Sequence, residues 1–544
     1  MRYLSENKRE DMRMKKRTAA RSMAALMGAA MVLTACGGGN TTAPTTGASS
    51  GGETQTASES AESGKITKTD IVVGQASDIV TLDPAGQQDT TSGVLMKHAY
   101  STLLDVDNEG KVVPDLAESY EMKSDMEYVF KLREDACFWD GTPVTAQDVK
   151  FSLDRAKGMP KTKSNTSKIE EVTVNGDHEV TIKLTEPYAA FKTIVTQHNL
   201  SILSEKAVTE AGDSYGDVDN LLGSGPFKVT EWVPNDHYTL VRNDNYWGEM
   251  PIATSITCRV IPEGSARTIA LEAGEIDVVW SVDPTDCANV ESNPDVKLLS
   301  QPSTGIDYVG MNTQKEKFSD KRVRQAINYA LDKQAFVDTI IEGRGLVANS
   351  YINAAIPGWT DEVEAYPYDP EKAKELLAEA GYPDGFECSI FVNGDLRTRS
   401  AQILQAQLAD VGIKVDISTY EWGALLDTLN AGEHEMFLLG WSNTSFDPDG
   451  STYQLFYSGN HGATGNRAFF SNDKVDELIL SAQRESEESK RMELYKELQF
   501  VLHEESPWCP LYYKENNVGV RADLKGFTLH AGAQHYLGNC HYEE

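Results

Sequence analysis

The chain changes character sharply near Lys65, and this boundary decides how much of it can fold. Residues 37–64 consist almost entirely of Gly, Ser, Thr, Ala and Glu and contain no large apolar side chain. Such a segment cannot bury enough apolar surface to offset its chain entropy, so we expect a flexible coil. The remaining stretch of about 480 residues has ordinary apolar content, which is enough for two or three packed units rather than one core.

The first 35 residues have the composition of a targeting segment. Basic residues cluster over 13–21, and an apolar run over 22–35 follows them. This run is shorter than the roughly 18 residues that a membrane-spanning helix needs, so it predicts a signal peptide that is removed. Acidic residues precede Met12, which favours a start of translation at Met12 or Met14.

The segment Leu33-Thr34-Ala35-Cys36-Gly37 resembles the lipobox of bacterial lipoproteins, in which a lipid is attached to the cysteine. The resemblance implies a lipoprotein signal peptide over 1–35 and a diacylglycerol on Cys36. Ordinary secretory cleavage is the alternative. A flexible tether over 36–65 reaches roughly 30 Å by random-coil scaling, which keeps a folded body close to the outer face of the membrane.

The composition is strongly acidic, with 83 acidic and 50 basic residues and a net charge of −33 at pH 7. A surface of this sign repels nucleic acid and anionic lipid headgroups. We therefore expect no nucleic-acid partner, and membrane contact only through the lipid anchor. Six further cysteines are scattered singly without metal or redox spacing, and we expect most of them to be free and buried. They are Cys137, Cys258, Cys287, Cys388, Cys509 and Cys540.

Strands and helices alternate irregularly from Ile66 onward, a pattern typical of a mixed α/β protein. Alternating apolar residues over 172–174 and 180–184 flank Asn175-Gly176, a dipeptide that favours a type I′ turn, and they predict a β-hairpin.

Two helices have clear start signals. Asp369 followed by Pro370 predicts a cap and first turn for a helix over 370–380. Thr145 with Asp148 predicts a capped helix that extends through Ala156.

Patterns for catalysis and metal binding are weak. The segment 212–216, Gly-Asp-Ser-Tyr-Gly, matches the sequence pattern of a nucleophile elbow around Ser214. A nucleophile elbow needs a strand before the serine, whereas residues 204–211 predict a helix. Three histidines and a cysteine near the C-terminus have a spacing that fits no zinc site: His530, His535, Cys540 and His541. We expect no enzyme activity, no metal and no cofactor, and a hydrolase acting through Ser214 stays the remote alternative.

Three blocks of sequence are similar to the extracytoplasmic solute-binding proteins of ABC importers, in the peptide, dipeptide and nickel family called family 5. The first block comprises LAESY at 116–120, FKLRED at 130–135 and FWDGTPVTA at 138–146. The second comprises GSGPF at 223–227, YWG at 246–248 and GEID at 274–277. The third comprises VRQA at 323–326, ALD at 330–332, YEWG at 420–423 and Gly440-Trp441. The similarity keeps one order from about Ile71 to Phe527.

This resemblance implies a two-lobed, periplasmic-binding-protein-like α/β fold with a hinge between the lobes and a small domain inserted in the first. We expect lobe I over 66–300, with the inserted domain at about 106–214. Lobe II is expected over 301–508, and 509–544 return to lobe I. A solute buried between such lobes stabilises the closed form only through contacts that it makes better there, and the importer then recognises that form.

The resemblance also implies where a solute binds. Similar dipeptide and oligopeptide receptors have an aspartate three residues after the Gly-Trp pair, which binds the peptide ammonium. Thr444 occupies this position, so the charge-assisted bond is missing unless Asp447 replaces it. The loop is closer to that of glutathione receptors. The expected ligand-binding residues are Trp441, Ser442, Asn443, Thr444, Asp447, Arg397, Gln88 and Asp89.

Two residue choices stay open within this expected site. Arg399 is an alternative to Arg397 as the group that binds a ligand carboxylate, and Trp441 either forms an aromatic wall or packs in a core. Four other tryptophans match packing or turn positions of the family: Trp139, Trp232, Trp247 and Trp280.

These inferences predict a monomeric lipoprotein at the outer face of the cell membrane. It captures a short peptide or glutathione-like solute and delivers it to ABC permease and ATPase subunits. Oligosaccharides, opines, nickel chelates and haem are alternative solutes for the same role. A chemosensory or adhesive lipoprotein without an importer is an alternative class.

Overall fold

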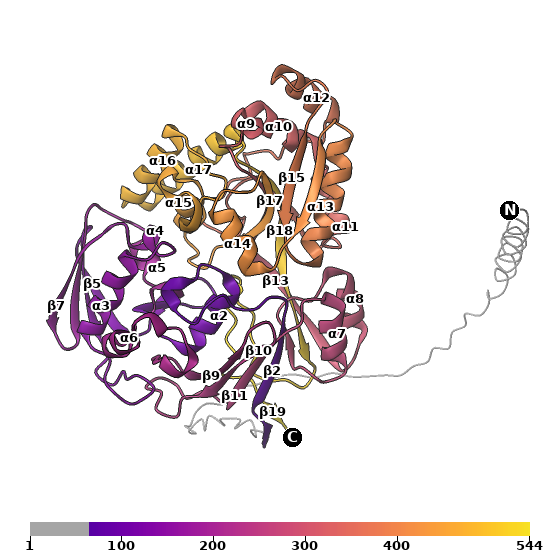
Figure 1. Ribbon diagram of the computed structural model, residues 1–544. Helices are drawn as coiled ribbons and strands as arrows, with labels where there is room; N and C mark the ends of the chain where they lie inside the picture. Colours follow the sequence, from indigo (N-terminus) through magenta and orange to yellow (C-terminus); the bar gives the residue numbers. More distant parts are fainter. Residues whose placement is uncertain (1–64) are drawn as a thin grey trace, which may run out of the picture. The chain divides into compact units, whose positions relative to one another are not determined.

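The computed structural model describes residues 65–544, which form a single unit (Figure 1). The predicted signal peptide over 1–35, Cys36 and nearly all of the predicted tether lie outside the described residues. One large sheet runs through the unit. Its strands, in sheet order, are β16 (Lys414–Thr419), β15 (Glu387–Val392), β17 (Met436–Ser442), β13 (Val296–Met311), β18 (Trp508–Arg521), β12 (Val278–Val279), β2 (Asp70–Gln75), β11 (Ser255–Val260), β10 (His237–Arg242) and β9 (Phe227–Val233), with β14 (Gly345–Val347) beside β18.

The long antiparallel strands β13 and β18 join the two halves of this sheet. On one side β13 pairs with β17, and on the other β18 pairs with β12. Figure 1 places both strands between the helix-rich part around β15 and the part that holds β2 and β9 to β11. Their mutual register shifts between Pro302 and Ile306, which breaks the ladder where the chain passes from one lobe to the other. The two-lobed α/β fold is confirmed, and β13 and β18 occupy the position of the hinge.

The predicted domain bounds fall close to these strands. The bound at 300/301 lies inside β13, and the bound at 508/509 lies at the beginning of β18. The exact limits of lobe I, the inserted domain and lobe II stay predictions.

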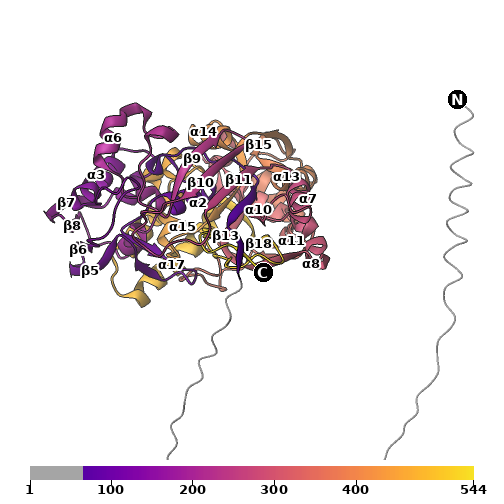
Figure 2. The same cartoon turned by 90° about the horizontal axis from the view of Figure 1, so that it is seen from below.

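A second, four-stranded sheet has its own core. It consists of β5 (Ala117–Ser124), β6 (Glu127–Leu132), β8 (Glu179–Leu184) and β7 (Ile169–Gly176), in that order. The helix α3 (Ala146–Lys157) covers it, and apolar side chains from residues 103–202 pack between them. Figures 1 and 2 both place this sheet and α3 at one side of the unit. This layer lies within the segment predicted as the inserted domain.

The hairpin of β7 and β8 forms, but its turn differs from the predicted one. Gly176 pairs with Glu179, so Asp177 and His178 make the turn in place of Asn175-Gly176. In this register Val172 lies opposite Ile182, and both are buried. A slip of one residue would turn these side chains to solvent, so burial outweighs the turn preference of Asn-Gly.

Helices surround the large sheet on the β15 side. They are α9 (Glu316–Ser319), α10 (Lys321–Ala330), α11 (Lys333–Thr339), α12 (Pro370–Glu379), α13 (Gly394–Ala409), α14 (Trp422–Asn430), α15 (Asp449–Phe456), α16 (Asp473–Arg484) and α17 (Glu488–Glu505). The remaining helices are α2 (Thr90–Ala99), α4 (Lys163–Thr166), α5 (Phe191–Ile194), α6 (Glu205–Ala211), α7 (Gly264–Glu272) and α8 (Cys287–Ser292).

Both predicted helix starts are confirmed. Asp369 accepts a hydrogen bond from the Lys372 amide at the start of α12. Thr145 and Asp148 form a reciprocal capping box at the start of α3.

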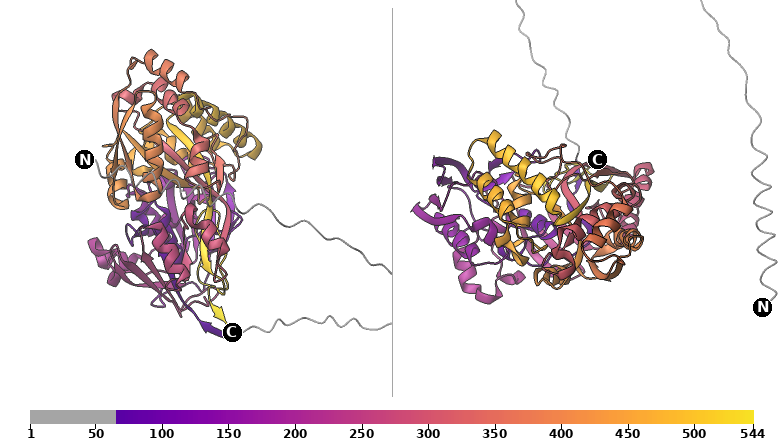
Figure 3. Two further views of the ribbon diagram at one scale, coloured as in Figure 1. Left: turned by 90° about the vertical axis from the view of Figure 1, so that its right-hand side faces the viewer. Right: turned by 90° about the horizontal axis from the view of Figure 1, so that it is seen from above.

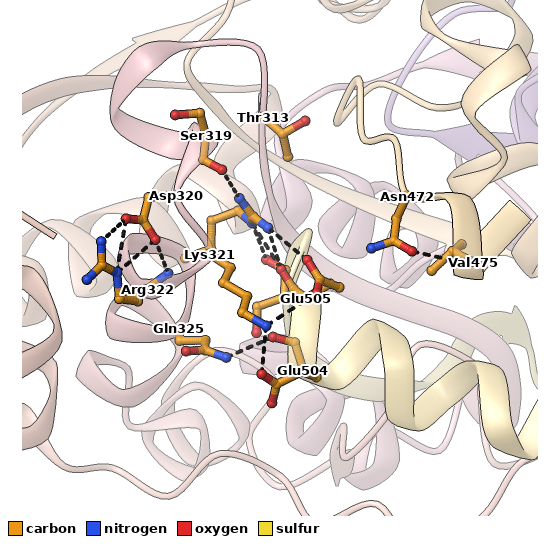
Figure 4. Close-up of polar contacts among 12 residues, drawn as sticks. Thr313, Ser319, Asp320, Lys321, Arg322, Gln325, Asn472, Val475, Glu504 and Glu505 are labelled. Carbon is orange, nitrogen blue, oxygen red and sulfur yellow. Dashed lines mark hydrogen bonds and ion pairs between the residues drawn. The ribbon is translucent and has the colours of Figure 1, made fainter.

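Ion pairs and hydrogen bonds join the C-terminal end of α17 to the beginning of α10 (Figure 4). Lys321 Nζ lies 2.8 Å from Glu504 Oε1 and 3.3 Å from Glu505 Oε1. Behind this exposed cluster, the buried guanidinium of Arg324 donates to the carbonyl oxygens of Phe318, Ser319, Glu505 and Ser506. Arg324 thereby satisfies carbonyl groups that a helix end leaves free.

The two ends of the described chain meet. The strand β1 (Ile66–Lys68) pairs with β19 (Tyr542–Glu543), as the adjacent indigo and yellow arrows in Figure 3 show. The described chain therefore enters and leaves the unit at one place.

Candidate functional site

A cavity of about 400 Å³ lies between the two sides of the large sheet. One wall comes from the segments 77–94, 197–199, 280–284 and 533–535. The opposite wall comes from residues 393–397 and from side chains between Trp422 and Arg467. The strand β18 contributes residues 512–517 at its floor. A cavity of this size between two lobes is the usual place for a small-molecule site.

The structure brings most of the predicted site residues together at this cavity. Those that line it are Gln88, Asp89, Arg397, Trp441, Ser442 and Thr444. Asn443 and Asp447 lie behind the wall. Trp280 and Trp422 also line it. The Trp280 ring stacks on His535, with ring centroids 5.2 Å apart, so it packs as expected and reaches the cavity as well.

The loop after Trp441 is held by its own side chains. The amide of Asn443 donates to Asp447 O at 2.7 Å and to Ser451 Oγ at 2.8 Å. Arg491 binds both carboxylate oxygens of Asp447, with Nη1 2.8 Å from Oδ2. The Asp447 carboxylate is therefore engaged by Arg491 inside lobe II, and it does not face the cavity as a free anion.

The two walls touch across the cavity at several points. Thr444 Oγ1 donates to Gln197 Oε1 at 2.8 Å, and Gln88 Nε2 donates to Thr464 O at 3.3 Å. Arg399 Nη2 lies 2.6 Å from Asp283 Oδ2. These contacts join residues on opposite sides of the hinge strands, so they hold the two walls together in this arrangement of the lobes.

The alternative arginines, Arg397 and Arg399, have different surroundings. Arg397 lines the cavity, donates to Asn393 Oδ1 at 2.7 Å and lies over the Trp422 ring at 5.8 Å. Its Nε is 3.9 Å from Asp307 Oδ1. Burial by itself would raise the pKa of Asp283. The hydrogen bonds from Arg399 and Thr285 together outweigh this effect, so the pKa of Asp283 falls below its usual value. Arg399 is thus occupied in an ion pair, and Arg397 is the one at the wall.

Asp89 caps the helix α2 and also lines the cavity. Its Oδ1 accepts from the Ser92 amide at 2.9 Å. Its Oδ2 is buried and has no hydrogen-bond partner among residues 65–544. Burial raises the pKa of this carboxyl above its usual value.

Arg467 is a cationic side chain at the cavity that sequence analysis missed. It is only 6 % exposed, and its Nε donates to Asn430 Oδ1 at 3.0 Å. It forms no ion pair with any carboxylate of the described part of the chain. Burial lowers its pKa. The available signal was a lone arginine within the otherwise uncharged segment Gly462–Phe470, because a charge is seldom buried unless it has a partner or a function.

The cavity has the opposite charge balance to the whole chain. Its lining includes four basic side chains and two acidic ones, although the net charge of the protein is −33. The cationic residues are Arg344, Arg397, Arg467 and Lys514, and the acidic residues are Asp89 and Glu515. Burial lowers the pKa of His198 and of His535 to about 3, so neither adds charge near neutral pH. Arg344 pairs with Glu291 at 2.7 Å and Lys514 pairs with Asp307 at 2.9 Å, whereas Arg397 is 3.9 Å from Asp307. Arg397 and Arg467 are therefore the lining cations least engaged by carboxylates, and they favour ligands that carry a carboxylate.

The weak catalytic and metal-binding patterns of the sequence lie outside any arrangement suited to that chemistry among residues 65–544. Ser214 lies in a short 3-10 turn that follows the helix α6, as the predicted helix over 204–211 requires. Within residues 65–544, no group of three or more His, Cys, Asp or Glu side chains is placed to hold a metal. His530 and His535 accept backbone amides of their own segment. The six scattered cysteines are separate thiols, of which Cys137 alone is half-buried and the others are buried.

None of the described helices combines the length and apolar character needed to cross a bilayer.

A two-lobed α/β fold with a cavity between the lobes at the hinge strands is typical of solute-binding proteins. The sequence profile described as bacterial extracellular solute-binding proteins, family 5, matches residues 111–463. The chain belongs to this family, and the resemblance identified from sequence motifs is confirmed.

Relatives and solved structures agree with this assignment. The glutathione-binding protein GsiB of Escherichia coli K12 is 32% identical over 479 residues, which is 85% of this chain and 92% of GsiB. The periplasmic binding protein DppA of Helicobacter pylori, solved with the peptide STSA, has a TM-score of 0.84 at 28% identity and covers 88% of this chain and 99% of its own. The binding protein AgaA of A. tumefaciens R10, solved with agropinic acid, has a TM-score of 0.82 at 27% identity and covers 87% of this chain and 99% of its own.

Proposed function

We propose that this protein captures a short peptide or a glutathione-like solute between its lobes and delivers it to an ABC permease with its ATPase subunits. The observation that carries the proposal is the cavity of about 400 Å³, with aromatic and cationic side chains on its walls. Relatives named for glutathione and for peptides support the choice of solute.

Both apolar and polar side chains of the cavity lining would contact a captured ligand. Trp441 and Trp422 offer apolar surface to a ligand chain, and Ser442 and Thr444 offer hydrogen-bonding groups. Residues on opposite sides of β13 and β18 would both contact one ligand. A ligand that contacts both walls stabilises the closed form by the difference between its free energies of binding to the closed and open forms. The importer subunits would recognise that closed form.

The proposal includes membrane attachment through Cys36. A lipid on this cysteine and a tether over 36–65 would hold the capture unit within roughly 30 Å of the outer face of the membrane. Such a receptor stays near its permease as a monomer.

An opine is the second candidate solute for the same role. The specific support is the similarity to the agropinic acid-bound AgaA together with the cationic lining of the cavity. An acidic opine would offer a carboxylate to the arginine side chains of this lining.

A thermal-shift screen of the full-length protein tests the proposed solute class. The ligands are short peptides, glutathione, opines, oligosaccharides and nickel chelates. At a hundredfold excess over its dissociation constant, a ligand specific for the native state adds about 2.7 kcal/mol of stability. Stabilisation by a peptide or glutathione is expected, and stabilisation by a sugar alone would refute the proposed solute.

A further inference from the structure

Two oppositely charged side chains at the cavity lack the partners that such groups usually have when buried. Oδ2 of Asp89 is buried without a hydrogen bond, and Arg467 is 6 % exposed without an ion pair among residues 65–544. Both residues line the cavity. A buried carboxylate oxygen without a hydrogen bond and a buried guanidinium without a carboxylate partner both cost free energy, so these groups are prepared for a ligand.

Asp89 and Arg467 come from opposite sides of the hinge strands. Asp89 stands at the beginning of α2, before β13 in the chain, and Arg467 follows the helix α15, after β13. They are close enough to influence each other electrostatically, but they form no ion pair. Lys161 also lies near Asp89 without pairing with it. Asp89 and Arg467 therefore offer one charge of each sign to the same cavity, from opposite sides of the hinge strands.

We propose that the cavity recognises an α-amino-acid head group, in which one carbon carries both an ammonium and a free carboxylate. Asp89 binds the ammonium, and Arg467 binds the carboxylate. This inference rests on the proposed function and narrows it to one chemical class, the γ-linked glutamyl peptides. In such peptides the glutamyl residue is joined through its side-chain carboxyl, so its α-carbon keeps both charged groups.

An ordinary α-linked peptide lacks this arrangement. Its first residue has a free ammonium, but the neighbouring carboxyl is used in the peptide bond. The ammonium would reach Asp89, and Arg467 would stay without an anion. The position of Asp89 also explains how an ammonium can bind although Thr444 offers no charge.

Glutathione and its α-linked isomer form a matched pair of probes. Both are Glu-Cys-Gly tripeptides with the same atoms and the same net charge, and they differ only in which glutamyl carboxyl forms the amide. The experiment is isothermal titration of the full-length protein with each isomer. We expect the γ-linked isomer to bind about tenfold more tightly or better, because one charge-assisted contact is lost with the other isomer.

Variants separate the two roles. Arg467→Met should bring the ratio of the two dissociation constants close to one, and Arg467→Lys, which keeps the charge, should retain part of the preference. Asp89→Asn should weaken the binding of both isomers by a similar factor, because both isomers carry the ammonium. Arg259→Met is the control, since this arginine is on β11 outside the cavity and its side chain is 43% exposed. Its ratio should equal that of the wild type.

Three outcomes would overturn the inference: equal affinity of the wild type for both isomers, an unchanged ratio in both folded Arg467 variants, or no binding of either isomer. Equal affinities would leave the proposed peptide receptor standing. A lack of binding by the isomers and by every short peptide in the thermal-shift screen would remove both proposals.

Discussion

Arg491 of α17 and Asp447 of the loop after β17 form a buried, bidentate ion pair, in which Arg491 Nη1 lies 2.8 Å from Asp447 Oδ2. The Arg491 side chain is 9% exposed and the Asp447 side chain is 11% exposed. The pair anchors the loop that begins directly after Ser442 and includes Thr444 of the cavity wall. Asp447 therefore positions the loop, whereas a role as the ammonium-binding group would need a free carboxylate.

Breaking this pair should destabilise the protein. Asp447→Asn leaves the Arg491 charge buried without its partner, and we expect a loss of about 3–5 kcal/mol in the free energy of unfolding of lobe II. Urea unfolding followed by tryptophan fluorescence measures it. The double change Asp447→Asn with Arg491→Met should recover part of the loss. An Asp447→Asn protein of unchanged stability that no longer binds peptide would show that Asp447 contacts the ligand.

The ion pair of Arg399 with Asp283 should act on closure. It spans the hinge strands at 2.6 Å, and the Arg399 side chain is 37% exposed, so solvent screens it. Arg399→Ala is expected to weaken ligand binding about two- to fivefold, because it removes one contact of the closed form. Titrations at low and at high salt should show a smaller effect at high salt. A complete loss of binding would instead make Arg399 a ligand contact.

The carboxyl of Asp449 should make stability depend on pH. Burial and the neighbouring Asp447 raise the pKa of Asp449 to about 6, while it accepts from Tyr188 OH at 2.6 Å and from Gln483 Nε2 at 2.9 Å. The folded state thus binds this proton more tightly than the unfolded state. Its contribution is fully present below about pH 4 and is lost as the pH rises through about 6.

Asp449→Asn removes this dependence. Relative to the wild type, the variant should gain up to about 3 kcal/mol between pH 4 and pH 7, whatever constant offset the lost hydrogen bonds cause. Melting temperatures of both proteins across this range provide the measurement. A difference that stays constant with pH would contradict the raised pKa.

Changing Cys36 should alter location only. Cys36→Ser prevents attachment of the lipid, so the protein should move from the membrane fraction to the soluble fraction with an unchanged dissociation constant for its ligand. Fractionation and titration of the released protein test this. A changed dissociation constant would indicate that the tether takes part in binding.

The fold could be predicted because its signals are local or extend over long blocks. Capping residues such as Thr145 and Asp369 act on the adjacent turn of helix, and their predicted starts agree with α3 and α12. The turn of the β7–β8 hairpin could not be predicted from Asn175-Gly176, because the partner strand decides which residues are buried.

The candidate site was predictable in part for the same reason. Trp441 belongs to the recognisable pair Gly440-Trp441, and Thr444 follows this pair three residues later. Arg467 and Trp280, by contrast, reach the cavity only through tertiary packing. That Asp447 would bind Arg491, 44 residues away, also depends on packing that no local pattern reveals.

The most direct test of solute capture at the hinge is isothermal titration of the full-length protein and of a cavity-filling variant, Ser442→Trp. Ser442 is the last residue of β17 and lines the cavity, so an indole there would occupy space that a ligand needs. We predict one-to-one binding of glutathione or of a short peptide by the wild type and no detectable binding by the folded variant. Binding of equal strength by both proteins would contradict the account.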